Sequence, residues 1–179
     1  MAPLRRAGTR LGEILGLRVR DVDFAADSLR IVQSADNVEG IGPTKSGKGR
    51  SVPMVPEVAH VLARTLSRDG FAAPDDLVFP NAGVGQPIDG SALRRRYKAA
   101  QTRAGLRPLR FHDLRHTFGS LASRVAMPLE VQHWLGHADA RTTARYSHHR
   151  PQAEDAAKLA RAFTTSTETE TLPEETTAS

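Results

Sequence analysis

Residues 111–150 hold side chains whose types and spacing could carry out chemistry. One apolar set recurs every three or four positions and predicts an amphipathic helix: Phe111, Leu114, Phe118, Leu121 and Val125. A second set falls roughly opposite that face at about 100° per residue: His112, Arg115, His116 and Gly119. Imidazole and guanidinium groups beside a bare glycine leave room for a ligand, and their charge predicts an anion.

Two further groups lie on either side of this helix. Downstream, an apolar segment ends in Leu135-Gly136-His137, and Tyr146 follows nine positions after His137. Upstream, a helix predicted over residues 10–17 places Arg10 and Glu13 three residues apart on one side. Taken alone, that pair would be a surface ion pair contributing only about 0.3–0.5 kcal/mol.

Residues 42–54 predict a β-hairpin. Lys45 lies near the end of the first strand, a Ser-Gly-Lys-Gly turn follows, and residues 50–54 form the returning strand. Lys48 is the second candidate for a functional lysine, and a solubilising hairpin tip is the alternative for both. The segment lacks the order of glycines, lysine and hydroxyl residue that a phosphate-binding P-loop requires.

These pieces, in this order and at this spacing, resemble the signature of the phage-integrase-type tyrosine recombinases. The resemblance rests on His112-x-x-Arg115, Leu135-Gly136-His137 and Tyr146, and on the Gly8–Leu15 segment that carries Arg10. Thr9 occupies a position where the family more often has an aliphatic residue. The resemblance implies an α+β catalytic domain over residues 1–163, mostly helical, with a small antiparallel β-sheet or hairpin.

The resemblance also implies a reaction. Cutting a DNA phosphodiester without water needs a nucleophile, positive groups around the phosphate and an acid for the leaving oxygen. The implied roles are Tyr146 as nucleophile, Arg10, Arg115 and His137 as phosphate clamp, Lys45 as general acid, His112 in proton transfer and Glu13 in support. No metal or nucleotide cofactor is required. The pairs His112/His116 and His133/His137 have metal-ligand spacing, but no acidic or thiol partner accompanies them.

Double-stranded DNA is the expected partner. A helix predicted over residues 91–104 carries a run of cations that could follow a DNA backbone or form a solvated face: Arg94, Arg95, Arg96 and Lys98. In the family the segment after the tyrosine often docks on a neighbouring protomer, which implies a homo-oligomer, a tetrameric synapse, joined through the C-terminal helix. Tyr97 and Trp134 are assigned to packing.

Composition limits the remaining classes of function. A sequence pI of about 10.2 is consistent with a nucleic-acid partner. The absence of cysteine excludes disulfides and a thiol nucleophile. No apolar run approaches the roughly 20 residues of a membrane span, and residues 1–6 lack the apolar core of a signal peptide, so the cytoplasm is the expected compartment.

The expected organisation is one domain and a tail. Helices are also predicted over residues 56–68, 128–136, 140–148 and 151–163, and residues 164–179, rich in Thr and Glu, are expected to be disordered. Only nine residues precede Arg10, whereas family members usually have catalytic-domain helices and a DNA-clamping domain there. The alternative function is therefore a truncated, non-catalytic DNA-binding remnant of an integrase.

Overall fold

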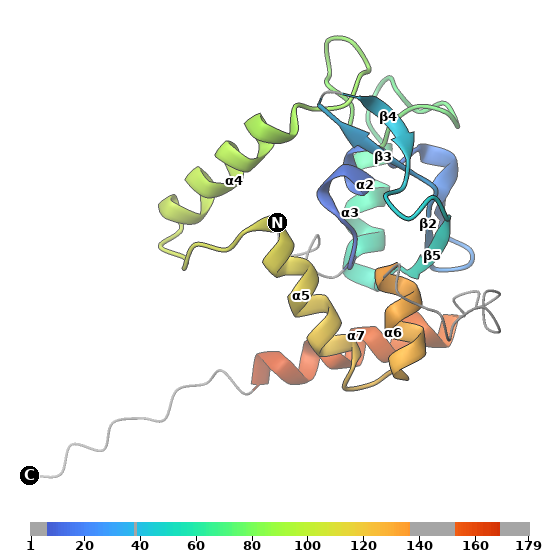
Figure 1. Cartoon of the computed structure of the whole chain (residues 1–179), viewed down its shortest axis with the longest axis vertical. Helices are drawn as coiled ribbons and strands as arrows, with labels where there is room; N and C mark the ends of the chain where they lie inside the picture. The colour runs from blue at the N-terminus through green and yellow to red at the C-terminus, as the bar shows by residue number, and fades with distance from the viewer. Residues whose placement is uncertain (1–6, 38, 137–152, 169–179) are drawn as a thin grey trace, which may run out of the picture.

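The computed structural model describes residues 7–37, 39–136 and 153–168, and within them an α+β fold (Figure 1). Three strands form one antiparallel sheet in the order β1 (Val22–Asp23), β2 (Ser28–Ile31) and β5 (Arg50–Pro53). Two more, β3 (Gln33–Asp36) and β4 (Gly40–Pro43), form a second antiparallel sheet. The α+β class predicted from the sequence is confirmed.

The predicted hairpin around Lys45 is wrong in its pairing. β4 pairs with β3, in the register Ser34 to Gly42, and β5 pairs with β2, in the register Leu29 to Val52. Residues 44–49 therefore connect two sheets instead of two partnered strands. Local sequence marked the strands and the turn between them, but pairing is decided by packing against the rest of the chain.

The described helices up to residue 135 begin and end close to the predicted positions, and the helix predicted over residues 140–148 lies outside the described residues. The described helices are α2 (Leu11–Leu15), the 3₁₀ turn η1 (Val19–Asp21), α3 (Pro56–Leu66), α4 (Gly90–Arg103), α5 (Phe111–Ala122), α6 (Pro128–Leu135) and α7 (Ala153–Glu168). Proline opens α3 and α6, where its missing N–H costs no hydrogen bond. The cap of α4 differs from the prediction: Asp89 accepts a hydrogen bond from the Ser91 N–H at 2.8 Å, and Ser91 lies inside the helix.

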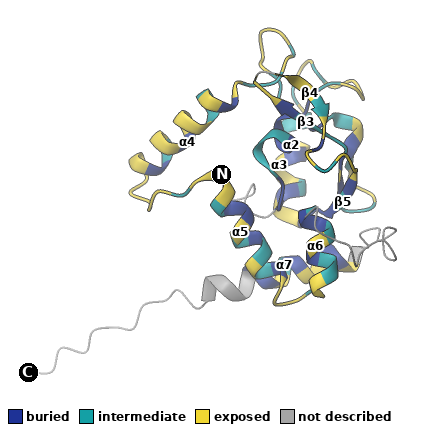
Figure 2. Ribbon diagram, viewed as in Figure 1, coloured by how far each residue is buried: buried dark blue, intermediate teal, exposed yellow. Residues whose placement is uncertain are grey.

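The core lies where α5, α6 and α7 meet the three-stranded sheet (Figure 2). Phe118 and Trp134 are fully buried, in agreement with their predicted packing roles. In α7 the buried side chains include Leu159 and Ala162, while Ala157 is exposed. The helix also continues to Glu168, five residues beyond its predicted end at residue 163.

Helix α4 stands apart from the sheets, and most of its surface is exposed (Figures 1 and 2). At its start, the Asn37 side chain donates to Asp89 Oδ1 at 2.7 Å and accepts from the Gly90 N–H at 3.0 Å. Farther along, the ring of Tyr97 lies 4.5 Å from that of Phe111 at the start of α5. These contacts hold α4 across a cleft from α2. None of the helices in the described residues combines the length and hydropathy needed to cross a membrane.

Candidate active site

Glu13 is the carboxylate around which the site is built. It lies on α2 and is 1% exposed. Its Oε1 accepts from Arg50 Nη1 and from Arg10 Nη1, both at 2.9 Å, and its Oε2 accepts from Arg50 Nη2 and from the Arg10 N–H, both at 2.7 Å. The surface ion pair considered from the sequence is thus a buried network with two guanidinium groups.

The network changes the acidity of Glu13. Burial alone raises the pKa of its carboxyl group, but the hydrogen bonds and charge of Arg50, together with hydrogen bonds from Arg10, outweigh burial. The result is a pKa lowered from 4.5 to about 2. Glu13 is therefore ionised throughout the physiological range and fixes both arginines.

Arg115 enters the same region from α5 and is 5% exposed. Its Nη1 donates to the carbonyl of Gly8 at 2.8 Å, and its Nη2 donates to the carbonyl of Leu135. Burial, and after it the charges of Arg10 and Arg50, lower the pKa of Arg115, while Glu13 opposes them; the net result is a pKa of about 10. At neutral pH it keeps its charge, with no carboxylate hydrogen-bonded to it among the described residues.

Gly8 allows this approach. Its φ of +61° lies in the left-handed region, and a Cβ there would meet ring carbons of Phe118 at 2.6 Å. The segment before Arg10 can therefore lie directly on α5, where the Gly8 carbonyl reaches Arg115. This is a physical reason for glycine at the first position of the Gly8-Thr9-Arg10 segment.

The end of α6 is held by the two predicted arginines. Arg115 binds the carbonyl of Leu135, and Arg10 Nη2 lies 3.4 Å from the carbonyl of Gly136. These are the last two described residues before His137. Both His137 and Tyr146 lie outside the described residues, so their predicted roles stay predictions.

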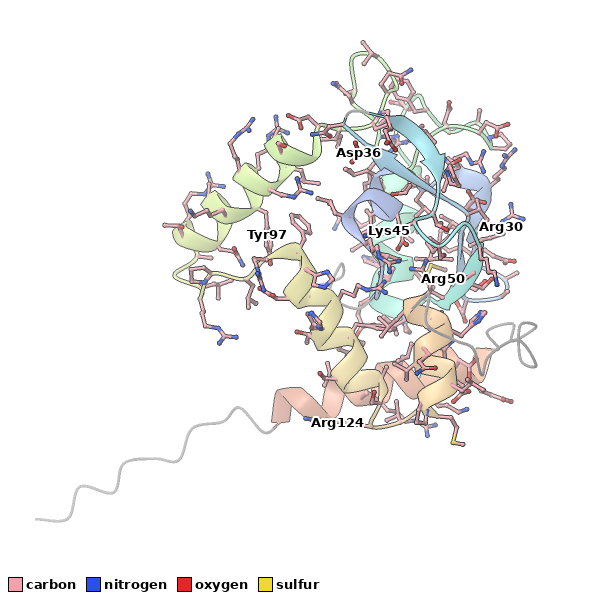
Figure 3. All side chains as sticks on the ribbon, viewed as in Figure 1. Arg30, Asp36, Lys45, Arg50, Tyr97 and Arg124 are labelled. Carbon is pink, nitrogen blue, oxygen red and sulfur yellow. The ribbon has the colours of Figure 1, made fainter. Side chains whose placement is uncertain are left out.

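Four predicted site residues line one open cleft: Arg10, Lys45, His112 and Arg115. Lys45 is exposed in the loop after β4 and lies near the centre of the molecule in the view of Figure 3. Lys48 is not among the lining residues. The loop is shaped by the Thr44 hydroxyl, which donates to the Lys48 carbonyl at 2.8 Å, and by the Gly47 N–H, which donates to the Thr44 carbonyl at 2.7 Å.

The cleft is predominantly basic. Six Lys or Arg side chains line it against two acidic ones, Asp36 and Glu39. Of the four cations predicted on α4, Arg94 and Lys98 line the cleft, while Arg95 and Arg96 are exposed elsewhere on the helix. A spacing of four residues places Arg94 and Lys98 on one face. An excess of positive charge in a concave surface favours an anionic ligand.

His112 faces the cleft from the first turn of α5. Desolvation lowers its pKa, and the neighbouring His116 and Arg115 lower it further. Its ring makes an edge-to-face contact with that of His116, with 4.6 Å between centroids. A lowered pKa favours neutral imidazole at neutral pH, a form that can accept a proton.

Arg50 is the residue of this network that sequence reasoning missed. It was assigned only to the returning strand of the hairpin. In the structure it is 6% exposed and joins Glu13 to the α6 carbonyl of Trp134 at 2.8 Å. A signal existed, because Arg50 and Val52 share one face of β5 and Met54, directly after the strand, continues the same alternation; Val52 and Met54 are fully buried. An arginine in the inward phase of such a strand predicts a buried ion pair.

The chain is similar to known proteins in sequence and in fold. Residues 2–153 match the model of the phage integrase family. Tyrosine recombinase XerC of Xanthomonas axonopodis pv. citri is 33% identical over 146 residues, which cover 79% of this chain and 43% of the relative. A putative prophage phiRv2 integrase of Mycobacterium tuberculosis is 32% identical over 145 residues, covering 78% and 39%. The chain thus spans about two-fifths of the length of these relatives.

Solved structures share the fold. A Tn1549 transposon integrase bound to transposon right end DNA superposes with a TM-score of 0.63 at 22% identity, covering 90% of this chain and 56% of that one. XerA recombinase gives a TM-score of 0.58 at 26% identity, covering 91% and 55%. With the family model matching most of the sequence, and with the motif arginines gathered at one cleft, the chain belongs to the phage integrase family.

Proposed function

We propose that this chain carries out site-specific DNA recombination, in integration or excision, by cutting and rejoining DNA strands through a 3′-phosphotyrosyl intermediate. The observation that carries the proposal is the common cleft lined by Arg10, Lys45, His112 and Arg115. A phosphodiester is a poor electrophile, and positive hydrogen-bond donors around its non-bridging oxygens stabilise the charge that develops during displacement.

In the proposed reaction the Tyr146 hydroxyl oxygen attacks phosphorus, and the bond from phosphorus to the 5′ oxygen breaks. His112 accepts the tyrosyl proton, in keeping with its lowered pKa. Lys45 donates a proton to the departing 5′ oxygen. Attack by the 5′-hydroxyl of a partner strand then reverses these steps and releases the tyrosine, so the bond energy is kept without a cofactor.

Within this scheme Arg10, Arg115 and His137 hold the phosphate, and Glu13 supports Arg10. The backbone contacts of Arg115 leave further N–H groups for a ligand, since a guanidinium carries five. Arg10 is likewise only partly engaged by Glu13, and 30% of its side chain is exposed. Both guanidiniums thus keep donors available on the cleft side.

Double-stranded DNA is the proposed partner. The Tn1549 integrase of similar fold was solved with transposon DNA, and the basic lining of the cleft supports the same class of ligand here. Arg94 and Lys98 on α4 would contact phosphates opposite the active-site arginines, and such contacts weaken as salt rises.

A homo-oligomeric synapse, a tetramer joined through the C-terminal helix, completes the proposal. In α7 the side chains of Ala156, Leu159 and Phe163 are buried within their own chain. A neighbouring protomer would therefore contact the exposed face, which includes Ala157 and Lys158. Sedimentation of the chain with and without cognate duplex measures this assembly.

The decisive experiment is selection of covalent adducts from a library of nicked suicide duplexes with a randomised core. The wild-type chain should form an adduct that survives denaturant, and Tyr146→Phe should form none. Tyr97→Phe is the matched control, because Tyr97 is the only other tyrosine in the sequence and packs on Phe111. The adduct should persist in a chelator. Salt-dependent binding with no adduct from any duplex would favour the non-catalytic DNA-binding alternative.

A further inference from the structure

Arg50 joins three segments that are far apart in the sequence. From β5 its two terminal nitrogens donate in parallel to the two oxygens of Glu13 on α2, and its Nε donates to the carbonyl of Trp134 near the end of α6. Figure 3 shows Arg50 between the sheet and α6. All three nitrogens of its guanidinium thus donate hydrogen bonds, two to Glu13 and one to Trp134.

Arg50 does not line the cleft, so it does not meet the cleft's ligand directly. Its partners, however, hold groups that do. Glu13 binds the backbone and side chain of Arg10, and Trp134 directly precedes Leu135, whose carbonyl binds Arg115. Arg10 and Arg115 therefore both depend on atoms that Arg50 fixes.

Gly136 shows how closely the end of α6 is fitted to Arg50. A Cβ at Gly136 would lie 2.9 Å from Arg50 Cδ and 3.0 Å from Cζ and Nε, and the φ of Gly136 is +61°. Glycine is therefore required at this position both by backbone conformation and by the guanidinium packed against it. Any side chain there would displace the same arginine that anchors Glu13.

We propose that Arg50 is a positioning residue, which sets the distance and orientation of the Arg10 and Arg115 guanidiniums through its bonds to Glu13 and to the end of α6. The proposal rests on the proposed function, because it takes a phosphodiester to be the group those guanidiniums hold. Lysine cannot replace Arg50, since a single ammonium cannot make the forked pair with Glu13 and the bond to Trp134 at once.

The experiment follows the Nε–Hε signals of Arg10 and Arg115 by NMR in the ¹⁵N-labelled full chain, titrated with dimethyl phosphate. The probe is the simplest phosphodiester anion. In the wild type both signals should move together with one Kd. In Arg50→Lys, measured at a temperature where the variant is folded, binding should weaken about tenfold, because a clamp displaced by a fraction of an ångström loses alignment with both oxygens.

Gly136→Ala, which keeps the arginine, should show a similar loss and tests the same geometry if Arg50→Lys does not fold. The matched control is Arg68→Lys. Arg68 also bridges backbone carbonyls, those of Phe71, Leu77 and Val78, but it lies outside the network, and its variant should bind within twofold of wild type. Arg50→Lys and Gly136→Ala proteins that melt earlier but bind dimethyl phosphate like the wild type would overturn the proposal.

Failure of the proposed function gives a different result. A wild-type chain that neither binds dimethyl phosphate nor forms a DNA adduct refutes the phosphate clamp. The ligand-free spectra then decide the role of Arg50. Arg10 and Arg115 signals that shift in Arg50→Lys but not in Arg68→Lys support positioning, and signals unchanged in both overturn it.

Discussion

Replacing Glu13 by Gln should destabilise the chain in a strongly pH-dependent way. Gln keeps the size of the side chain but removes the charge that faces Arg50 and Arg10. Arg50 is 6% exposed, so the variant leaves a buried guanidinium without its carboxylate. Removing one member of a buried ion pair typically costs about 3–5 kcal/mol, because the remaining charge cannot return to water.

The pKa of Glu13 gives a second, independent value for this loss of stability. A value of about 2 in the folded chain against 4.5 for the free side chain corresponds to about 3 kcal/mol of stability at neutral pH. Because the folded-state pKa is the lower one, this contribution is fully present above about pH 4.5 and is lost as pH falls toward 2. The free energy of unfolding of wild type and Glu13→Gln should therefore differ by about 3 kcal/mol at pH 7 and converge on acidification.

Urea unfolding at pH 7, 5 and 3 measures this convergence. Arg110 and Asp113 at the start of α5 provide a matched control, because they repeat the arrangement of Arg10 and Glu13. In both pairs the arginine N–H donates to the carboxylate three residues later at 2.7 Å. The pair of Arg110 and Asp113 is exposed on the arginine side, and Asp113→Asn should change stability little. An equal difference between wild type and Glu13→Gln at pH 7 and pH 3 would refute the reasoning.

Three further changes follow from local geometry. Gly8→Ala should lower the free energy of unfolding, measured in urea, by roughly 3 kcal/mol or more. A Cβ at this position would meet the Phe118 ring at 2.6 Å, and the φ of Gly8 is +61°. Thr9→Val should raise the free energy of unfolding by about 1 kcal/mol, because the buried Thr9 hydroxyl has no hydrogen-bond partner among the described residues. A higher Tm of the variant would show this gain. Asn37→Ala should speed hydrogen exchange in α4 and leave exchange in α3 unchanged, because Asn37 fastens the start of α4.

The spacing of apolar residues predicted the helices well, because each helix buries one stripe of apolar side chains. In α3, α5 and α6 apolar residues recur every three or four positions. In α3 and α6 a proline also marks the first turn. The strands were harder, because each is at most four residues long and β5 pairs with β2, which precedes β3 and β4 in the chain. Residues 42–54 read locally as one hairpin, yet β4 and β5 belong to different sheets. Nothing within that segment encodes the choice of partner.

At the site, the sequence identified the residues that face a ligand better than those that hold them. Arg10, Lys45, His112 and Arg115 were found through a motif, and all four line the cleft. Arg50 was missed because its partners lie 37 and 84 residues away. The carbonyl groups of Gly8 and Leu135 could not be predicted either, since every residue has one and only the fold decides which point at Arg115.

The charge balance of the network explains why an anion should bind there. The guanidiniums of Arg10 and Arg50 bind the carboxylate of Glu13, and the charge of Arg115 acts on the same group without a hydrogen bond to it. Three positive charges and one negative charge leave two positive charges in excess. The pKa of Arg115 is lowered first by burial and then by repulsion from the other two arginines. A bound phosphodiester would oppose that repulsion and raise the pKa of Arg115. The network is thus held together without a ligand by Glu13 and backbone carbonyls, and it keeps unneutralised charge at the cleft for the group it is proposed to cleave.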